Sequence, residues 1–241
     1  MGTTITAVDP SLPTVVAATP DLPFRPGATP AAELGRQVEV YLALGFAHLL
    51  GTDEAGFRSM LTPTLAAAEE PGAVPGAAPD GLDPSDHVPV LLVLPTVALN
   101  DAAPAMRRGD RRGVSVIDPV EAARYRPVPR DVPAGPAYLV VGIDTGSEFR
   151  SVPPAEALVT VQSRRRTPLT VAEGVALTVV RPDMLRPNRC FSLMGSRAGD
   201  RRVPAVWISE RRAKLGWCWD GNPHTWLGAA SAARRLGPPG S

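Results

Sequence analysis

The chain has 241 residues, a formal net charge of +1 and 44% hydrophobic residues, a composition that excludes wholesale disorder. A chain of this length can bury roughly 70% of its unfolded surface, so we expect one domain with its own core. The lack of a long apolar run or secretory leader, together with only two cysteines, favours a cytoplasmic protein without a membrane partner.

The N-terminal segment is rich in proline. Residues 1–28 hold five prolines and show little hydrophobic periodicity, which predicts a flexible arm outside the folded domain. Deleting this arm should therefore change the melting temperature little. We expect a single domain over residues 29–241.

A helical hairpin is predicted over residues 29–70. Thr29 and Pro30 form an N-cap and first-turn pair, and the first helix is expected to end at Gly51. Thr52 is expected to cap the second helix. A loop rich in proline, glycine and alanine follows over residues 71–87, before a sheet-containing core over residues 88–236.

The middle of the chain alternates strand and helix patterns. Apolar runs predict three strands, and capping patterns such as Thr170–Glu173 predict three helices. The strands are expected at 88–94, 113–117 and 137–144, and the helices at 120–125, 153–163 and 170–180.

The C-terminal part has a different sequence pattern, with short apolar segments separated by turns. Three short apolar segments at 190–193, 203–208 and 215–219 predict an antiparallel meander, and residues 229–236 predict a short closing helix. The fold class expected is therefore α+β: an N-terminal helical hairpin, a mixed central sheet with helices and a C-terminal meander.

Charge is distributed unevenly along the chain. Residues 1–100 carry three arginines and eleven acidic residues, whereas residues 181–241 carry eleven basic residues and four acidic ones. Two interpretations stand: a solvated basic face that pairs with the acidic half, or a site for a small anionic molecule. The near-neutral total and the lack of a nucleic-acid motif predict no nucleic-acid partner.

Two turns near the C-terminus could form an anion site. Arg197, Arg201 and Arg202 lie in a glycine-framed turn and are predicted to bind an anion, unless the turn is simply exposed. In the second turn, His224 and Asp220 are candidates for acid–base catalysis, although His224 could instead stabilise the turn. Four neighbours would line the pocket, unless its aromatic members are core residues: Trp217, Trp219, Asn222 and Trp226.

Neither metal nor cofactor is expected. Cys190 and Cys218 lie on apolar strands, where a buried inert thiol is usual, and they lack the paired spacing of zinc ligands. Motifs for dinucleotides, phosphate loops, serine hydrolases and zinc proteases are also missing from the sequence.

The string GWCWDGNPHTWLG, together with GVSVIDP and AYLVVGIDTG upstream, resembles a family of uncharacterised actinobacterial proteins with a domain of unknown function. The resemblance covers roughly residues 34–236. That family has no established activity to carry over, so the resemblance implies relatives and not a function.

Two function hypotheses follow. In the first, a pocket lined by tryptophan and arginine binds a carboxylate- or phosphate-bearing ligand, as a binding protein or an acid–base enzyme of specialised metabolism. In the second, the protein is a non-catalytic scaffold that docks a partner through its basic C-terminal face and its proline-rich arm. Convergence of His224, Asp220 and an arginine on one cleft would favour the first.

Overall fold

The computed structural model describes residues 21–75 and 81–238. Most of the predicted arm, residues 1–20, therefore lies outside the described residues. The arm's last residues contact the domain: the Leu22 carbonyl accepts from Arg36, and the Phe24 ring lies 3.5 Å from the Arg181 guanidinium. None of the described helices is long and apolar enough to cross a membrane.

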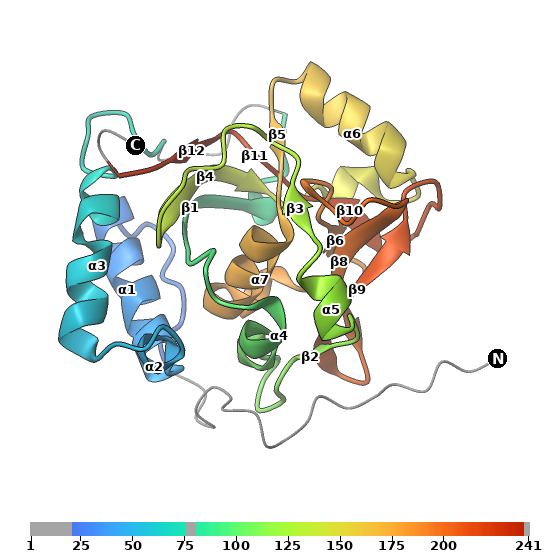
Figure 1. Cartoon of the computed structure of the whole chain (residues 1–241). Coiled ribbons are helices and arrows are strands. Elements are labelled where there is room, and N and C mark those ends of the chain that lie inside the picture. The colour runs from blue at the N-terminus through green and yellow to red at the C-terminus, as the bar shows by residue number, and fades with distance from the viewer. Residues whose placement is uncertain (1–20, 76–80, 239–241) are drawn as a thin grey trace.

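The elements form layers, with helices on the outside of one sheet and a central helix between two sheets (Figure 1). The α+β class, the N-terminal helix pair and the C-terminal meander are confirmed. The helices of one turn or more are α1 (Pro30–Ala43), α2 (Phe46–Leu49), α3 (Glu54–Ala66), α4 (Leu99–Ala102), α5 (Pro119–Ala122), α6 (Pro154–Ser163) and α7 (Val171–Val180).

The strands are β1 (His87–Val93), β2 (Val114–Ser115), β3 (Arg126–Pro127), β4 (Tyr138–Asp144), β5 (Thr167–Pro168), β6 (Cys190–Ser192), β7 (Ser196–Arg197), β8 (Arg202–Ser209), β9 (Arg212–Trp219), β10 (Leu227–Ala229), β11 (Ser231–Ala232) and β12 (Arg234–Leu236). Two five-stranded sheets hold most of them. The first has the order β1-β4-β11-β5 with β12 also beside β4, and all of its pairings are antiparallel. The second has the order β10-β6-β8-β9-β2 and is mixed, because β10 and β2 run parallel to their neighbours. A two-stranded ribbon pairs β3 with β7.

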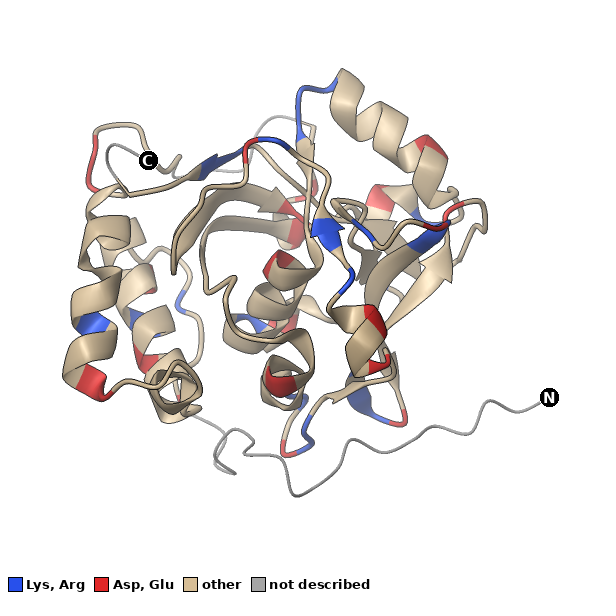
Figure 2. Ribbon diagram, in the orientation of Figure 1, with Lys and Arg blue, Asp and Glu red and all other residues tan. Residues whose placement is uncertain are grey.

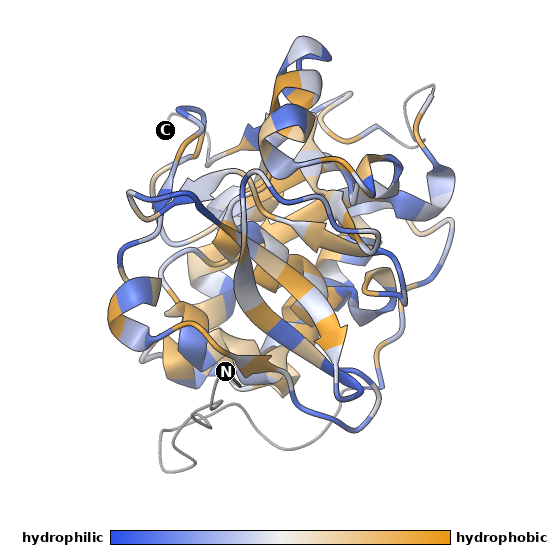
Figure 3. Cartoon of the chain, turned by 90° about the vertical axis from the view of Figure 1, so that its right-hand side faces the viewer, coloured by the Kyte–Doolittle hydropathy of each residue, from blue (hydrophilic) through white to orange (hydrophobic). Residues whose placement is uncertain are grey.

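Seen from the side of the second sheet, apolar colour gathers in the strands and hydrophilic colour in the turns (Figure 3).

Helix α1 covers the open edge of β1. The amide of Gln37 donates to the Val90 carbonyl at 3.0 Å and accepts from the Leu92 N–H at 2.8 Å, as a further strand would. The Tyr41 hydroxyl donates to the Leu92 carbonyl. An uncovered strand edge invites pairing with another chain, so these buried bonds protect the edge and fix α1 on the sheet.

Two predictions about the helical hairpin are wrong in detail. The first helix does not run to Gly51, because Gly45 takes a φ of 80° that separates α1 from α2. The cap of α3 is Asp53, whose side chain accepts from the Gly56 N–H, and not Thr52.

The closing helix predicted over residues 229–236 is also wrong. This segment forms β11 and β12, which pair with β4 and complete the first sheet. Its alanines and arginines favour a helix locally, but tertiary contacts override that preference. The buried Arg235 side chain forms an ion pair with Glu173 of α7, a contact that no local sequence pattern predicts.

Candidate functional site

Each of the three predicted anion-binding arginines has a partner within the protein. Arg201 Nε pairs with Asp220 Oδ1 at 2.9 Å, and Arg202 Nη1 pairs with Glu121 at 2.8 Å. The guanidinium of Arg202 also lies 4.3 Å from the Trp217 ring centroid. Their charges are therefore at least partly satisfied without a ligand.

Arg197 donates from Nη1 to the carbonyls of Met194 and Ser196, at 2.8 and 2.9 Å. Burial lowers its pKa below the usual arginine value, although the nearby Asp220 opposes that shift. Arg197 is thus held by main-chain oxygens, in surroundings drier than those of Arg201.

The two predicted catalytic residues are not hydrogen-bonded to each other in the structure. The Asp220 carboxylate takes the Arg201 ion pair, and the His224 carbonyl accepts from the Ser151 N–H at 2.9 Å. The His224 ring lies 5.1 Å from that of Trp226, and its Nε2 is buried without a hydrogen-bond partner among the described residues. The main chain of His224 therefore fixes its loop, whereas Nε2 of its side chain has no hydrogen-bond partner among those residues.

The four tryptophans divide into two pairs on opposite faces of the second sheet. Directly paired residues of antiparallel strands share a face. The register pairs Trp207 with Lys214 and Pro204 with Trp217, which places the two indoles on opposite faces. Trp207 contacts Trp226, with centroids 6.0 Å apart, and Trp217 contacts Trp219 at 5.3 Å.

A cavity of about 310 Å³, here called the tryptophan pocket, lies beside the Trp207–Trp226 pair. Four of the predicted ligand-binding residues and His224 belong to its lining, whereas the three predicted arginines and Asp220 do not. Its lining is Ala205, Trp207, Trp217, Cys218, Trp219, Asn222, His224, Trp226 and Leu227.

The thiol of Cys218 faces an apolar environment. Burial raises the pKa of this thiol to about 11, so it is protonated near neutral pH. Among the described residues, no three histidine, cysteine, aspartate or glutamate side chains are grouped so that they could hold a metal ion.

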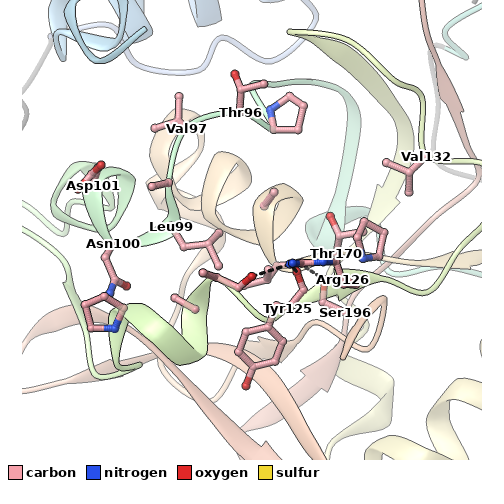
Figure 4. Close-up of a pocket in the computed structure, with 18 of the residues that line it drawn as sticks. Thr96, Val97, Leu99, Asn100, Asp101, Tyr125, Arg126, Val132, Thr170 and Ser196 are labelled. Atoms are coloured by element: carbon pink, nitrogen blue, oxygen red, sulfur yellow. Dashed lines mark hydrogen bonds between the residues drawn. The ribbon is translucent and has the colours of Figure 1, made fainter. Parts of the chain in front are cut away.

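A second cavity, of about 370 Å³, opens at the N-terminal end of α7 and was not predicted (Figure 4). We call it the helix-end pocket. Its walls combine apolar side chains with a few polar ones from segments far apart in sequence. The lining is Pro95, Thr96, Val97, Ala98, Leu99, Asn100, Asp101, Pro119, Ala122, Ala123, Tyr125, Arg126, Pro127, Val132, Tyr138, Thr170, Val171, Ala172 and Ser196.

The start of α7, beside this pocket, has one N–H without a side-chain cap. The first four N–H groups of a helix have no acceptor within the helix. Three have partners here: the Thr170 N–H donates to Glu173, the Val171 N–H to Ser196 Oγ, and the Glu173 N–H to Thr170 Oγ1. The capping box is therefore confirmed, and the fourth donor belongs to Ala172, which lines the pocket.

Two arginines are neighbours in the main chain beside the same pocket. Arg126, in the lining, lies directly opposite Arg197 in the β3–β7 ribbon. Their side chains have separate main-chain partners: Arg126 Nη1 donates to the Ala123 and Tyr125 carbonyls, and Arg197 Nη1 to those of Met194 and Ser196. Of the two, only Arg126 belongs to the pocket.

A buried ion-pair network supports the floor of the helix-end pocket. Arg235 pairs with Glu173 at 2.6 Å, and both side chains are 0% exposed. The Tyr138 hydroxyl donates to the same carboxylate at 3.0 Å, and Asp131 pairs with Arg235 at 3.0 Å. Because Tyr138 lines the pocket and Glu173 caps α7, this network fixes both.

Thr170 and Glu173 indicate the start of α7 in the sequence, but no local pattern indicates a cavity there. Its lining comes from the loops around α4 and α5, from β4 and from β7, which only the tertiary fold brings together. The tryptophan pocket was easier to anticipate, because all of its lining lies within residues 205–227.

Comparison with curated proteins gave no match, and neither did comparison with solved structures. A family model described as "Family of unknown function (DUF5701)" matches residues 40–238, which include all of both pockets. The chain therefore belongs to this family of unknown function.

Proposed function

We propose that this protein binds a small carboxylate with an apolar body in the helix-end pocket. The observation that supports the proposal is the meeting of three features: an apolar cavity, an N–H without a side-chain cap at the start of α7, and Arg126 in the lining. The proposal keeps the anionic ligand expected from the sequence and moves its site to the start of α7.

The size and walls of the cavity favour a small molecule. Its volume of about 370 Å³ is within the roughly 300–1,000 Å³ of known ligand pockets. Val97, Leu99 and Val132 provide apolar contact, and Tyr125 adds an aromatic ring. Burying the apolar part of a ligand here contributes about 25 cal/mol for each Å² removed from water.

The polar groups favour an acceptor with negative charge. A helix N-terminus carries partial positive charge, and the N–H of Ala172 lacks the side-chain cap that its neighbours have. Arg126 uses Nη1 to hold the Ala123 and Tyr125 carbonyls, which leaves its other nitrogens for a ligand oxygen. A guanidinium fork suits a carboxylate particularly well.

Thermal shift with a panel of aryl and straight-chain monocarboxylates, each beside its primary amide, tests this proposal. Acids should raise the melting temperature and amides should not. Ala123→Phe, at an exposed residue of the pocket lining, should abolish the shift in melting temperature. The control Ala66→Phe, at an exposed residue of α3, should leave that shift unchanged. Equal shifts from acids and amides, or an unaffected Ala123→Phe variant, would contradict the proposal.

A second candidate is binding of a planar ring in the tryptophan pocket. The buried, unpartnered Nε2 of His224 beside the Trp226 ring supports it, because such an atom gains a hydrogen bond from a suitable ligand. Acid–base catalysis by His224 with Asp220 has less support, since Asp220 is paired with Arg201.

A further inference from the structure

Two arginine-rich turns lie together at one end of the second sheet. The first, residues 107–112, leads into β2, and the second, residues 209–212, joins β8 to β9. Strand β2 pairs with β9, and Arg212 Nη1 donates to the Arg112 carbonyl at 3.1 Å. Figure 2 shows their basic segments near each other at the lower edge of the view. We call residues 107–112 and 209–214 the basic tip.

The basic tip differs from the rest of the protein in its ion pairing. It holds seven basic residues and only two acidic ones, Asp110 and Glu210. Among the described residues, five arginines of the tip form no ion pair with a carboxylate: Arg108, Arg111, Arg112, Arg211 and Arg212.

The geometry of the tip increases repulsion between these charges. Arg108 and Arg111 form an antiparallel bridge, so they lie directly opposite each other. Burial, and then the charge of Arg112, lower the pKa of the neighbouring Arg107. An arrangement that concentrates positive charge in this way is stabilised by a polyanion that places negative charge among the arginines.

The hairpin turn adds a second, independent observation. Glu210 and Arg211 have φ values of 53° and 61°, in the left-handed region. Two-residue hairpin turns of this kind favour Asn-Gly, because most other side chains are strained there. The chain thus holds a charged side chain at the tip in a conformation that disfavours it.

The nearest aromatic ring indicates which polyanion fits. Trp207 is the direct cross-strand neighbour of Lys214, and the period of a strand places Arg212 on the same face. Trp207 as a whole is half-buried, so it is not sealed in the core. Arginines beside an aromatic ring are the components of single-strand recognition, in which phosphates contact the cations and bases stack on the ring.

We propose that the basic tip binds single-stranded nucleic acid through its phosphate backbone. This site is separate from the helix-end pocket, and its occupancy does not depend on a carboxylate ligand. The sequence-based expectation of no nucleic-acid partner depended on the near-neutral total charge, which averages over this local excess.

Fluorescence anisotropy with a labelled single-stranded oligonucleotide tests the proposal. Binding should weaken steeply between about 50 and 200 mM salt, because bound cations are released from the phosphates. Replacing Arg108 and Arg111 by glutamine should reduce the salt slope by about 1.4, or roughly 0.7 for each phosphate that is no longer neutralised. The matched double variant Arg58→Gln, Arg164→Gln removes two paired, half-exposed arginines elsewhere and should leave the slope unchanged.

The turn variant Arg211→Gly separates structure from binding, because it removes one positive charge and one left-handed non-glycine residue. It should raise the melting temperature by removing strain and still weaken oligonucleotide binding. Equal losses in both glutamine double variants, no binding at low salt, or stronger competition by poly-glutamate than by the oligonucleotide would each overturn the proposal. The last result would indicate a surface for an acidic protein.

Discussion

The tryptophan pocket and the helix-end pocket have similar volumes, about 310 and 370 Å³, but different chemistry. The first is walled by indoles and an imidazole, and the arginines near it in sequence pair with carboxylates or main-chain carbonyls instead. The second has apolar walls, a helix N–H without a side-chain cap, and Arg126, whose Nε and Nη2 have no internal partner among the described residues. A cluster of arginines therefore identifies an anion site only when its internal partners are known.

The largest expected effect concerns the support of the helix-end pocket. Arg235→Met should lower the free energy of unfolding by about 3–5 kcal/mol, because Glu173 would be left as a buried, unpaired carboxylate. Chemical denaturation measures the change. Arg234→Met removes the adjacent arginine, which bonds only the Gly72 and Ala73 carbonyls, and should cost about 1 kcal/mol or less. Equal losses in the two variants would show that the buried pair does not fix α7.

The next effect concerns the wall of the tryptophan pocket. A Cβ at Gly216 would clash with the Trp207 indole and lie 2.9 Å from Val116 Cγ2. Gly216→Ala should therefore destabilise the fold by about 1–3 kcal/mol and shift the fluorescence of Trp207. Gly35→Ala, in an open position of α1, should instead stabilise it by up to about 1 kcal/mol. A neutral Gly216→Ala would mean that Trp207 is loosely held.

A smaller effect on stability is expected from His224. Its side-chain Nε2 has no partner to lose, and its main-chain bond to Ser151 survives substitution. His224→Asn should change the free energy of unfolding by less than about 1 kcal/mol. If the tryptophan pocket binds rings, affinity for indole or a related probe should fall in this variant. A large loss of stability with unchanged affinity would assign His224 a structural role only.

The smallest expected effect is on the rate at which the Cys218 thiol is alkylated. With the pKa of Cys218 raised to about 11, its thiolate fraction at pH 8 is about 0.1%. In the Cys190→Ser variant, alkylation by iodoacetamide should be slow and should accelerate about tenfold for each pH unit up to pH 10. Rapid alkylation at pH 7 would contradict this account and would make Cys218 a candidate nucleophile.

The sequence predicted elements better than sites. The strand at 88–94 and the helix at 170–180 were predictable because long apolar runs and a capping box are local patterns. The pairing of β12 with β4 was not, because the buried bond between Arg235 and Glu173 joins residues far apart in the chain. Likewise, nothing local reveals that Arg201 meets Asp220, or that Ala172 lines a cavity.

Crystallography of the protein soaked with a monocarboxylate that raises its melting temperature tests the central claim most directly. The account predicts electron density in the helix-end pocket, with a carboxylate oxygen within hydrogen-bond distance of the Ala172 N–H and near Arg126. Density only in the tryptophan pocket, or a carboxylate turned away from the start of α7, would contradict it.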